Sequence, residues 1–184
     1  METFIPLKPL VDNREFPAQR ARAIAELESA AIDAPIVGLV SGLNSLPYCF
    51  TIQSCCGHFL YGEHLDPRNT ERLPPSENSD TVEYRIAYVA LCVDNCGRGE
   101  SFLRDLQAVT CIDPDYVQFG CATWFWGRQV NSYALQVEPD RFKTKDSVCV
   151  DYQEALHLQS VRDACYARLG HVLDLRRGMP GPQR

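Results

Sequence analysis

The strongest constraint on the fold is a long strand predicted over residues 82–93. Its first half alternates between apolar and polar residues, whereas residues 88–93 are almost continuously apolar. A strand that is apolar on both faces is covered on both sides, so we expect this segment at the centre of the sheet. A chain of 184 residues is long enough to build one domain around such a strand without metals or disulfides.

Periodicity and turn residues predict the other elements. They are a helix from about Arg14 to residue 31, a helix over 36–45, a strand over 48–53, a helix around 102–109, strands over 116–126 and 130–137, and a helix over 152–172. This order favours an α+β domain, with a mixed β-sheet and helices packed on it. We expect residues 1–175 to form this single domain and the Gly- and Pro-rich residues 176–184 to form a disordered tail.

The bulk composition narrows the classes of partner and location. Eighteen basic against 24 acidic residues give a net charge of −6, which disfavours a large nucleic-acid footprint. Arg14, Arg20 and Arg22 are expected to form a solvated helix face. No apolar run approaches the roughly 18 to 20 residues of a membrane helix, and no basic region precedes an apolar run at the N-terminus. A cytoplasmic protein whose nine cysteines remain thiols is therefore expected, with no membrane partner.

The stretch after the strand over 48–53 carries most of the candidate chemistry. It contains Ser54, Cys55, Cys56, Gly57 and His58 in succession, which predicts a loop of small nucleophilic and hydrogen-bonding groups. Backbone amides in such a loop can hold an anionic or polar ligand, with the glycine allowing close approach. A plain tight turn is the alternative. The polar residues 63–80 then predict a surface loop, either a lid or a simple connection.

This region and a cluster of aromatic residues offer three further possibilities: metal binding, catalysis by a thiol, and stacking on a nucleobase. Candidate zinc ligands lie within ten residues, as Cys55, Cys56, His58 and His64. The spacings Cys55-x-x-His58 and Cys92-x₃-Cys96 loosely resemble paired zinc ligands. Cys56 and His58 would share one face of an extended segment, as a thiol and its base would. Trp124-Phe125-Trp126, expected on a strand, can either stack on a nucleobase or pack in the core. Neither a dinucleotide fingerprint nor a P-loop occurs.

The same stretch resembles a known family. Its members, the tRNA wybutosine-synthesising proteins that act at the methylation step, have an Asn before the strand and then Thr-Ser-Ser-Cys-Ser-Gly-Arg. Here the Asn44-Ser45-Leu46-Pro47 step and Thr51 are similar, Ser54, Cys55 and Gly57 match, Gln53 and Cys56 replace serines, and His58 replaces the arginine. Weaker similarity extends over Asp12-Asn13-Arg14, residues 87–93, residues 130–139 and Tyr166-Ala167-Arg168-Leu169.

The resemblance implies an α+β fold unlike the Rossmann methyltransferases. It also implies transfer of a methyl group from S-adenosylmethionine to a modified guanosine in tRNA. It implies that the catalytic residues are His58, as a proton acceptor, and Cys56. The ligand-binding residues would be Asp12, Asn44, Thr51, Ser54, Cys55, Gly57, Asn131 and Ser132. The changes at His58 and at Asn131, where the family has arginine, favour a modified nucleoside or another small ligand over whole tRNA. The alternatives are a ligand- or metal-binding protein on the same scaffold without this activity, and an interaction module.

Overall fold

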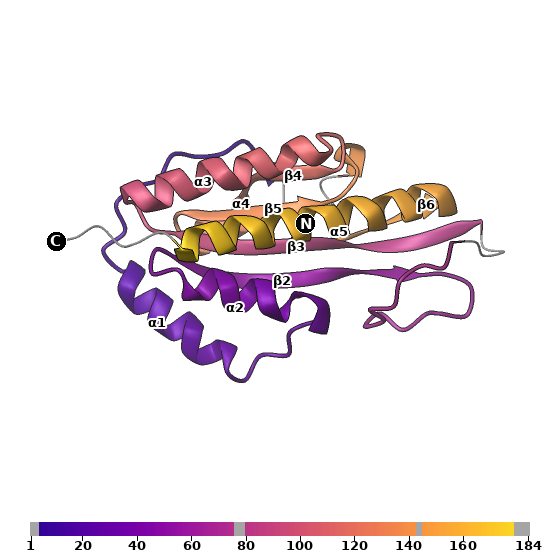
Figure 1. Ribbon diagram of the computed structural model, residues 1–184, viewed down its shortest axis with the longest axis horizontal. Coiled ribbons are helices and arrows are strands. Elements are labelled where there is room, and N and C mark those ends of the chain that lie inside the picture. Colours follow the sequence, from indigo (N-terminus) through magenta and orange to yellow (C-terminus); the bar gives the residue numbers. More distant parts are fainter. Residues whose placement is uncertain (1–3, 76–79, 143–144, 179–184) are drawn as a thin grey trace.

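Six strands form one sheet, and helices pack on it (Figure 1). The computed structural model describes residues 4–75, 80–142 and 145–178. The elements are β1 (Phe4–Ile5), α1 (Phe16–Leu27), α2 (Val37–Ser45), β2 (Cys49–Leu60), β3 (Thr81–Val93), α3 (Gly97–Val109), β4 (Val117–Ala122), α4 (Thr123–Arg128), β5 (Ser132–Val137), β6 (Ser147–Asp151) and α5 (Tyr152–Gly178), with 3₁₀ turns η1 (Ala34–Ile36), η2 (Thr110–Ile112) and η3 (Asp140–Phe142).

Strand β3 lies at the centre of the sheet, as the sequence predicts. It pairs with β2 along one edge, and along its other edge it pairs first with β6 and then with β5. The sheet order is β1-β4-β5-β3-β2, with β6 also on β3. The predicted α+β class is confirmed. The sheet was expected to be mixed, but every ladder among the described residues is antiparallel. One reason is that two neighbouring pairs, β2–β3 and β4–β5, are also consecutive in the chain.

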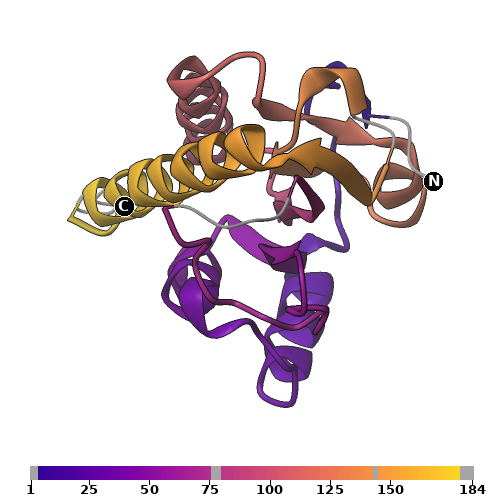
Figure 2. The same cartoon turned by 90° about the vertical axis from the view of Figure 1, so that its right-hand side faces the viewer.

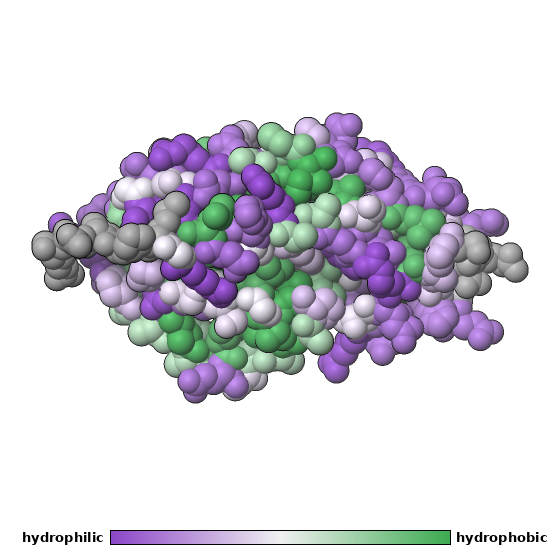
Figure 3. All heavy atoms as spheres, viewed as in Figure 1, coloured by the Kyte–Doolittle hydropathy of each residue, from purple (hydrophilic) through white to green (hydrophobic). Residues whose placement is uncertain are grey.

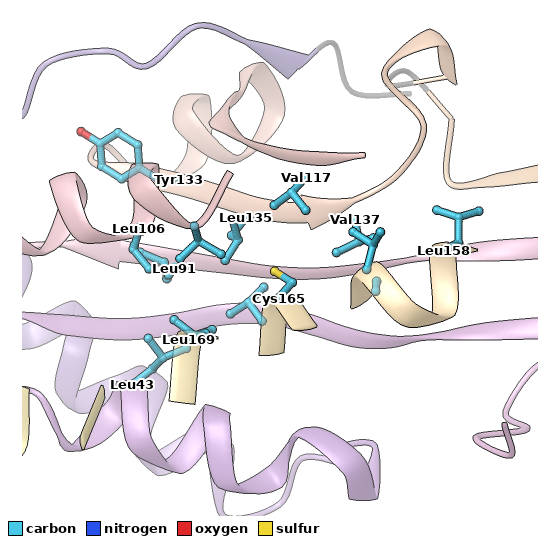
Figure 4. Close-up of a cluster of buried hydrophobic side chains, with 14 of the residues drawn as sticks. Leu43, Leu91, Leu106, Val117, Tyr133, Leu135, Val137, Leu158, Cys165 and Leu169 are labelled. Atoms are coloured by element: carbon cyan, nitrogen blue, oxygen red, sulfur yellow. The ribbon is translucent and has the colours of Figure 1, made fainter. Parts of the chain in front are cut away.

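Helices α2, α3 and α5 cover one face of this sheet (Figures 1 and 2). The apolar side of α5 supplies Leu158, Cys165 and Leu169 to the main hydrophobic cluster, where Leu169 is drawn beside Leu43 of α2 (Figure 4). All three are at most 1% exposed. Burial of such side chains contributes about 1.5–3 kcal/mol each, so this layer is the main source of stability. The predicted last helix is confirmed over 152–172.

The last helix is longer than predicted. Arg176 was assigned to a disordered tail, but α5 continues through Gly178. The Arg176 guanidinium donates hydrogen bonds to Asp105 and, at 2.8 Å, to Ser101 Oγ, both on α3. These contacts fix the end of α5 against α3, so the fold includes residues 176–178. Residues 179–184 lie outside the described part of the chain.

The segment around the three aromatic residues is helical, which corrects the strand predicted over 116–126. Strand β4 ends at Ala122, and α4 follows it directly. The Arg128 guanidinium lies 3.4 Å from the centroid of the Trp124 ring, four residues earlier. Such a contact at i, i+4 stabilises a helical turn, and the periodicity of a six-residue helix is too short to detect in sequence.

The opposite face of the sheet is only partly covered. Phe16 of α1 packs on Phe50 of β2, with 5.4 Å between ring centroids, and both contact Cys92 of β3. Helix α1 thus closes one end of this face, whereas α2 lies on the other side of β2 (Figure 2). The outer surface over α2, α3 and α5 mixes hydrophobic and hydrophilic patches (Figure 3). Among the described helices, none combines the length and the apolar character needed to cross a bilayer.

Candidate functional site

A pocket of about 590 Å³ lies on the sheet face that α2, α3 and α5 leave uncovered. Its floor comes from three adjacent strands, and its walls come from α4 and from two loops. The lining residues are Gln53, Ser54, Cys55 and His58 of β2; Arg85, Ile86 and Tyr88 of β3; Ala134 and Gln136 of β5 with Glu138; Ala122, Trp124 and Phe125; and Asp33, Lys145 and Asp146 at the sides. The pocket has the volume of a typical small-molecule site.

The predicted ligand loop is part of a strand. Residues 53–58 pair with residues 85–90 of β3, so strand β2 continues through the stretch that was expected to leave the sheet. Ser54, Cys55 and His58 nevertheless line the pocket. The predicted grouping of these three residues therefore holds, although a strand positions them instead of a loop.

The backbone conformation of Gly57 determines which side chains of this part of β2 line the pocket. In a regular strand Cys56 and His58 would lie on one face. Gly57 has φ +80°, a left-handed value that breaks the alternation. As a result Cys55 and His58 line the pocket, whereas Cys56 is buried against Ile36 and Val40 of the α2 region. Cys56 therefore does not face the pocket, which corrects its assignment as a catalytic residue.

Gly57 serves strand packing and does not contact the pocket. A Cβ placed on it would lie 2.8 Å from the Cβ of Ala87 on β3, which is closer than real Cβ atoms approach. Its carbonyl oxygen accepts a hydrogen bond from the Arg162 guanidinium of α5 at 3.3 Å. The glycine thus allows β2 and β3 to approach each other, and the predicted close approach of a ligand to its backbone is not what requires it.

His58 is buried at the pocket wall and is held by two polar groups. Its side chain is 7% exposed. The ring Nδ1 lies 2.9 Å from the carbonyl oxygen of Asn69, and the ring Nε2 lies 3.5 Å from Asp33 Oδ2. Asp33 Oδ2 also accepts the backbone N–H of Cys56 at 2.8 Å. Because a carbonyl can only accept, Nδ1 carries a proton in this arrangement.

Asp33 is a site residue that the sequence did not reveal. It lies between the helices predicted over 14–31 and 36–45, where no site residue was expected. In the structure the loop before η1 places its carboxylate beside Cys55 and His58, with one ligand atom from each residue within 4.8 Å of the others. The two sequence segments are more than 20 residues apart, and no local pattern connects them.

The thiols of this region are not activated nucleophiles. Burial raises the pKa of the Cys55 thiol, and the carboxylate of Asp33 raises it further. Burial and the same carboxylate raise the pKa of Cys56 to about 12. A Cys-His-Asp triad also needs the acid on one ring nitrogen and the thiol on the other. Here Nδ1 is used by Asn69, so the arrangement does not match a cysteine nucleophile with its base.

The far wall of the pocket contains a buried carboxylate that the sequence analysis also missed. Glu138 has no exposed surface, and its Oε2 accepts a hydrogen bond from Gln136 Nε2 at 2.8 Å. Gln118 Nε2 lies 3.3 Å from the Glu138 carbonyl oxygen. An acidic residue directly after an apolar strand was the available signal. The carboxylate therefore orients the Gln136 side chain, which lines the pocket.

Two predicted ligand-binding residues join α2 to β2. Asn44 Nδ2 donates to Thr51 Oγ1 at 2.7 Å, and Thr51 N donates to Asn44 Oδ1 at 3.1 Å. Asn44 does not line the pocket. Thr51 contributes to a second pocket of about 400 Å³ between α1 and β2, which shares Gln53 and Ser54 with the first.

Three other predicted ligand-binding residues lie away from the pocket. Asp12 is exposed and lies 3.6 Å from Arg14. Asn131 is buried with a left-handed φ of 61°, and its side chain bonds both the N–H and the carbonyl of Val11, at 2.9 and 2.8 Å. Ser132 is fully buried beside it. These contacts fix the backbone, so the structure does not bring the three residues to the ligand site.

The second half of the predicted zinc set is also elsewhere. Cys92 packs with Phe16 and Phe50. The Cys96 thiol accepts the Gly99 N–H at 3.4 Å and caps α3. His64 is exposed and stacks on Tyr61. Of the predicted ligands, only Cys55 and His58 come together in the described residues, and Asp33 joins them.

Comparison with known proteins shows a likeness in fold. No protein-family model matches the chain, and no curated protein matches it. The chain is similar to the solved structure of the PH1069 protein from Pyrococcus horikoshii, with a TM-score of 0.54 and 12% identity over 87% of this chain and 96% of that one. A structure of PH1069 from Pyrococcus horikoshii OT3 covers 88% of this chain and 91% of its own at 12% identity and a TM-score of 0.46. The first likeness supports the α+β fold alone.

Proposed function

We propose that this protein is a divergent methyltransferase of the wybutosine-synthesising type that binds a modified nucleoside and S-adenosylmethionine on the open face of its sheet. One observation carries the proposal. The segment that resembles the family contributes Ser54, Cys55 and His58 to a pocket of about 590 Å³. The family's fold and reaction enter as implications of that resemblance.

The residues of the larger pocket suit either of the two ligands. Trp124, Phe125 and Tyr88 offer flat surfaces on which an adenine or a guanine can stack. The carboxylates of Asp33 and Asp146 suit a sulfonium cation and an amino group. Arg85 and Lys145 suit a carboxylate. When bound, S-adenosylmethionine supplies an electrophilic methyl group.

The chain's own contribution would be positioning, exclusion of water and removal of a proton. Methyl transfer needs chiefly alignment of the acceptor atom, because proximity supplies much of the rate. His58 is held by Asn69, so its Nε2 is oriented and can accept the proton that the acceptor atom loses. Cys55 stays a neutral thiol beside it. His58 is therefore the residue that we retain as proton acceptor.

Two adjoining pockets favour a reaction of two ligands. The pocket of about 400 Å³ beneath α1 meets the larger one at Gln53 and Ser54. A donor and an acceptor bound in the two pockets would approach each other at these residues. We expect Ser54 to orient the reacting groups.

The charge of the chain favours a small acceptor. Its net charge is −6, and the larger pocket offers two cations against three carboxylates. Polyanionic tRNA requires a wider basic surface. We propose a cytoplasmic location, since each of the nine cysteines is a free thiol and such thiols persist in a reducing compartment.

Ligand binding by the intact protein tests the proposal. We expect S-adenosylmethionine and S-adenosylhomocysteine to raise the melting temperature. Replacement Trp124→Ala should weaken binding roughly tenfold, because loss of one stacking surface costs about 1–3 kcal/mol. Trp124 is 45% exposed, so the variant should fold. Leu65→Ala, at an exposed residue that does not line the pocket, is the matched control.

Transfer of a radiolabelled methyl group to guanosine-derived nucleosides is the second measurement. We expect incorporation with the wild type and a large loss with His58→Gln, whose fold is checked by circular dichroism. Absence of any melting shift at millimolar S-adenosylmethionine, together with absence of incorporation, would contradict the proposal.

A further inference from the structure

Three different metal-binding groups meet at the edge of the larger pocket. The carboxylate of Asp33, the thiol of Cys55 and the imidazole of His58 each place one ligand atom within 4.8 Å of the other two. Gly57 brings Cys55 and His58 to one face of β2, and the loop before η1 brings Asp33 to them. The sequence spacing of these groups is not that of a zinc finger, so the site exists only in the folded chain.

The orientation of the His58 ring places its Nε2 opposite the carboxylate of Asp33. Because Nδ1 donates to the Asn69 carbonyl, a neutral ring presents the lone pair of Nε2. That lone pair lies 3.5 Å from the carboxylate oxygen Asp33 Oδ2, which also presents lone pairs. Two acceptors this close, one of them buried, repel each other unless a proton or a metal ion lies between them. A metal ion coordinated by both atoms would remove this repulsion.

The groups around these side chains are those that orient metal ligands. A ligating histidine generally donates its other ring N–H to a carbonyl or a carboxylate, as His58 does to Asn69. The Asp33 carboxylate is fixed by the backbone N–H of Cys56 at 2.8 Å. Both ligands are thus held before a metal binds, which lowers the entropy lost on binding.

We propose that Asp33, Cys55 and His58 form a zinc site with an open coordination position facing the pocket. Sulfur, nitrogen and oxygen donors together suit zinc, whereas a thiol disfavours magnesium and calcium. Tetrahedral zinc holds nitrogen and oxygen ligands about 3.3–3.4 Å apart, given metal–ligand distances of roughly 2.0–2.1 Å. The observed 3.5 Å between His58 Nε2 and Asp33 Oδ2 is close to this value.

The fourth position gives the ion a chemical role. All three ligands line the pocket, so a water or a ligand oxygen or nitrogen can complete the coordination from the pocket side. Binding converts the Cys55 thiol to a thiolate, and its proton passes to the solvent. The proposal does not depend on methyl transfer, since zinc can polarise any oxygen ligand that enters the pocket. Coordination occupies the lone pair of His58 Nε2, so in the zinc-bound protein a metal-bound hydroxide would replace His58 as the proton acceptor.

Cobalt titration of the full chain tests the site. The exposed thiols are first removed in a Cys111→Ser, Cys149→Ser background, because they can bind metal adventitiously. The protein is then treated with a chelator and titrated with Co²⁺. We expect one equivalent to bind with the visible bands of a tetrahedral ion and the near-ultraviolet charge-transfer band of a thiolate. One proton should be released for each ion, and Zn²⁺ should displace the cobalt.

Single replacements assign the ligands. Cys55→Ser should abolish the thiolate band and weaken cobalt binding at least tenfold. Cys55 is only half-buried, so this variant should fold, as far-ultraviolet circular dichroism checks. His64→Gln, which removes an exposed histidine outside the cluster, is the control and should leave the spectrum unchanged.

Either of two results would refute the zinc site. If cobalt produces no thiolate band, or if Cys55→Ser binds it as tightly as the background protein, then the three side chains do not coordinate a metal and the zinc site is refuted. Binding of S-adenosylmethionine is measured separately on the metal-free protein. A failure of cobalt binding therefore does not imply a failure to bind S-adenosylmethionine, and the reverse also holds.

Discussion

At the scale of the residue, a single glycine determines which thiol of β2 lies beside His58 in the candidate site. Gly57 adopts a left-handed conformation in the middle of β2, where any other residue would be strained. The change in alternation places Cys55 beside His58 and turns Cys56 into the interior. A sequence reading that assumes regular alternation pairs the wrong thiol with the imidazole.

The two left-handed glycines of this region give a matched pair of replacements. Gly57→Ala should destabilise the fold by about 2–4 kcal/mol, because it adds backbone strain and a steric clash with Ala87. Gly62→Ala has a similar left-handed φ, but nothing lies within 4 Å of the added Cβ. It should cost only about 1 kcal/mol. Urea unfolding measures both, and equal losses would show that the approach to Ala87 is not limiting.

At the scale of the element, α1 fixes the connection that leads into the site. Arg20 was expected on a solvated helix face. Instead its guanidinium donates to the carbonyl oxygens of Asn44 at 2.7 Å, Leu46 at 3.3 Å and Cys49 at 3.2 Å. These carbonyls lie at the end of α2 and the start of β2. A long-range contact of this kind leaves no trace in local periodicity.

Removal of this guanidinium should loosen the connection between α2 and β2. We expect Arg20→Ala to lower the free energy of unfolding by about 2 kcal/mol, since hydrogen bonds from charged groups are worth roughly 1.5–3 kcal/mol. Arg20→Lys should recover only part of this loss, because an ammonium cannot span three carbonyls. The exposed Arg22 on the same helix is the control, and Arg22→Ala should change the stability by a few tenths of a kcal/mol at most. An equal effect of the two alanine variants would contradict this role.

Over the whole molecule, the burial of many thiols sets a limit on stability in alkali. Cys149 is exposed, whereas Cys56, Cys92 and Cys165 are at most 2% exposed. Burial raises the pKa of these three thiols from 9.0 to about 12. Between these values the unfolded chain loses protons that the folded chain keeps. The unfolded state therefore gains stability as the pH rises.

We expect the free energy of unfolding to fall from about pH 9 towards pH 12, by up to about 1.4 kcal/mol per pH unit for each buried thiol. Urea unfolding under reducing conditions at successive pH values measures the slope. Cys165→Ala should make the slope shallower, whatever cavity it leaves. Cys149→Ser, at an exposed thiol, is the control. A slope that Cys165→Ala leaves unchanged would contradict the prediction.

Local pattern alone predicted much of the architecture. Strand β3 and helix α5 were recognised because their apolar residues recur with the period of a strand or of a helix over many residues. The short α4 and the continuation of β2 through residue 60 were missed. Six residues carry too little periodicity, and the polar side chains of β2 face a pocket, so they resemble those of a loop.

The sequence by itself determined the α+β class, the central strand and the stretch of chain that contributes Ser54, Cys55 and His58 to the candidate site, because these depend on residues close together in the chain. Only the tertiary structure decided which side chains meet. Asp33, Gln136 and Glu138 reach the pocket through pairings between distant segments, and the left-handed Gly57 selects Cys55 over Cys56. Such meetings depend on strand register and on backbone conformation, which a one-dimensional pattern does not encode.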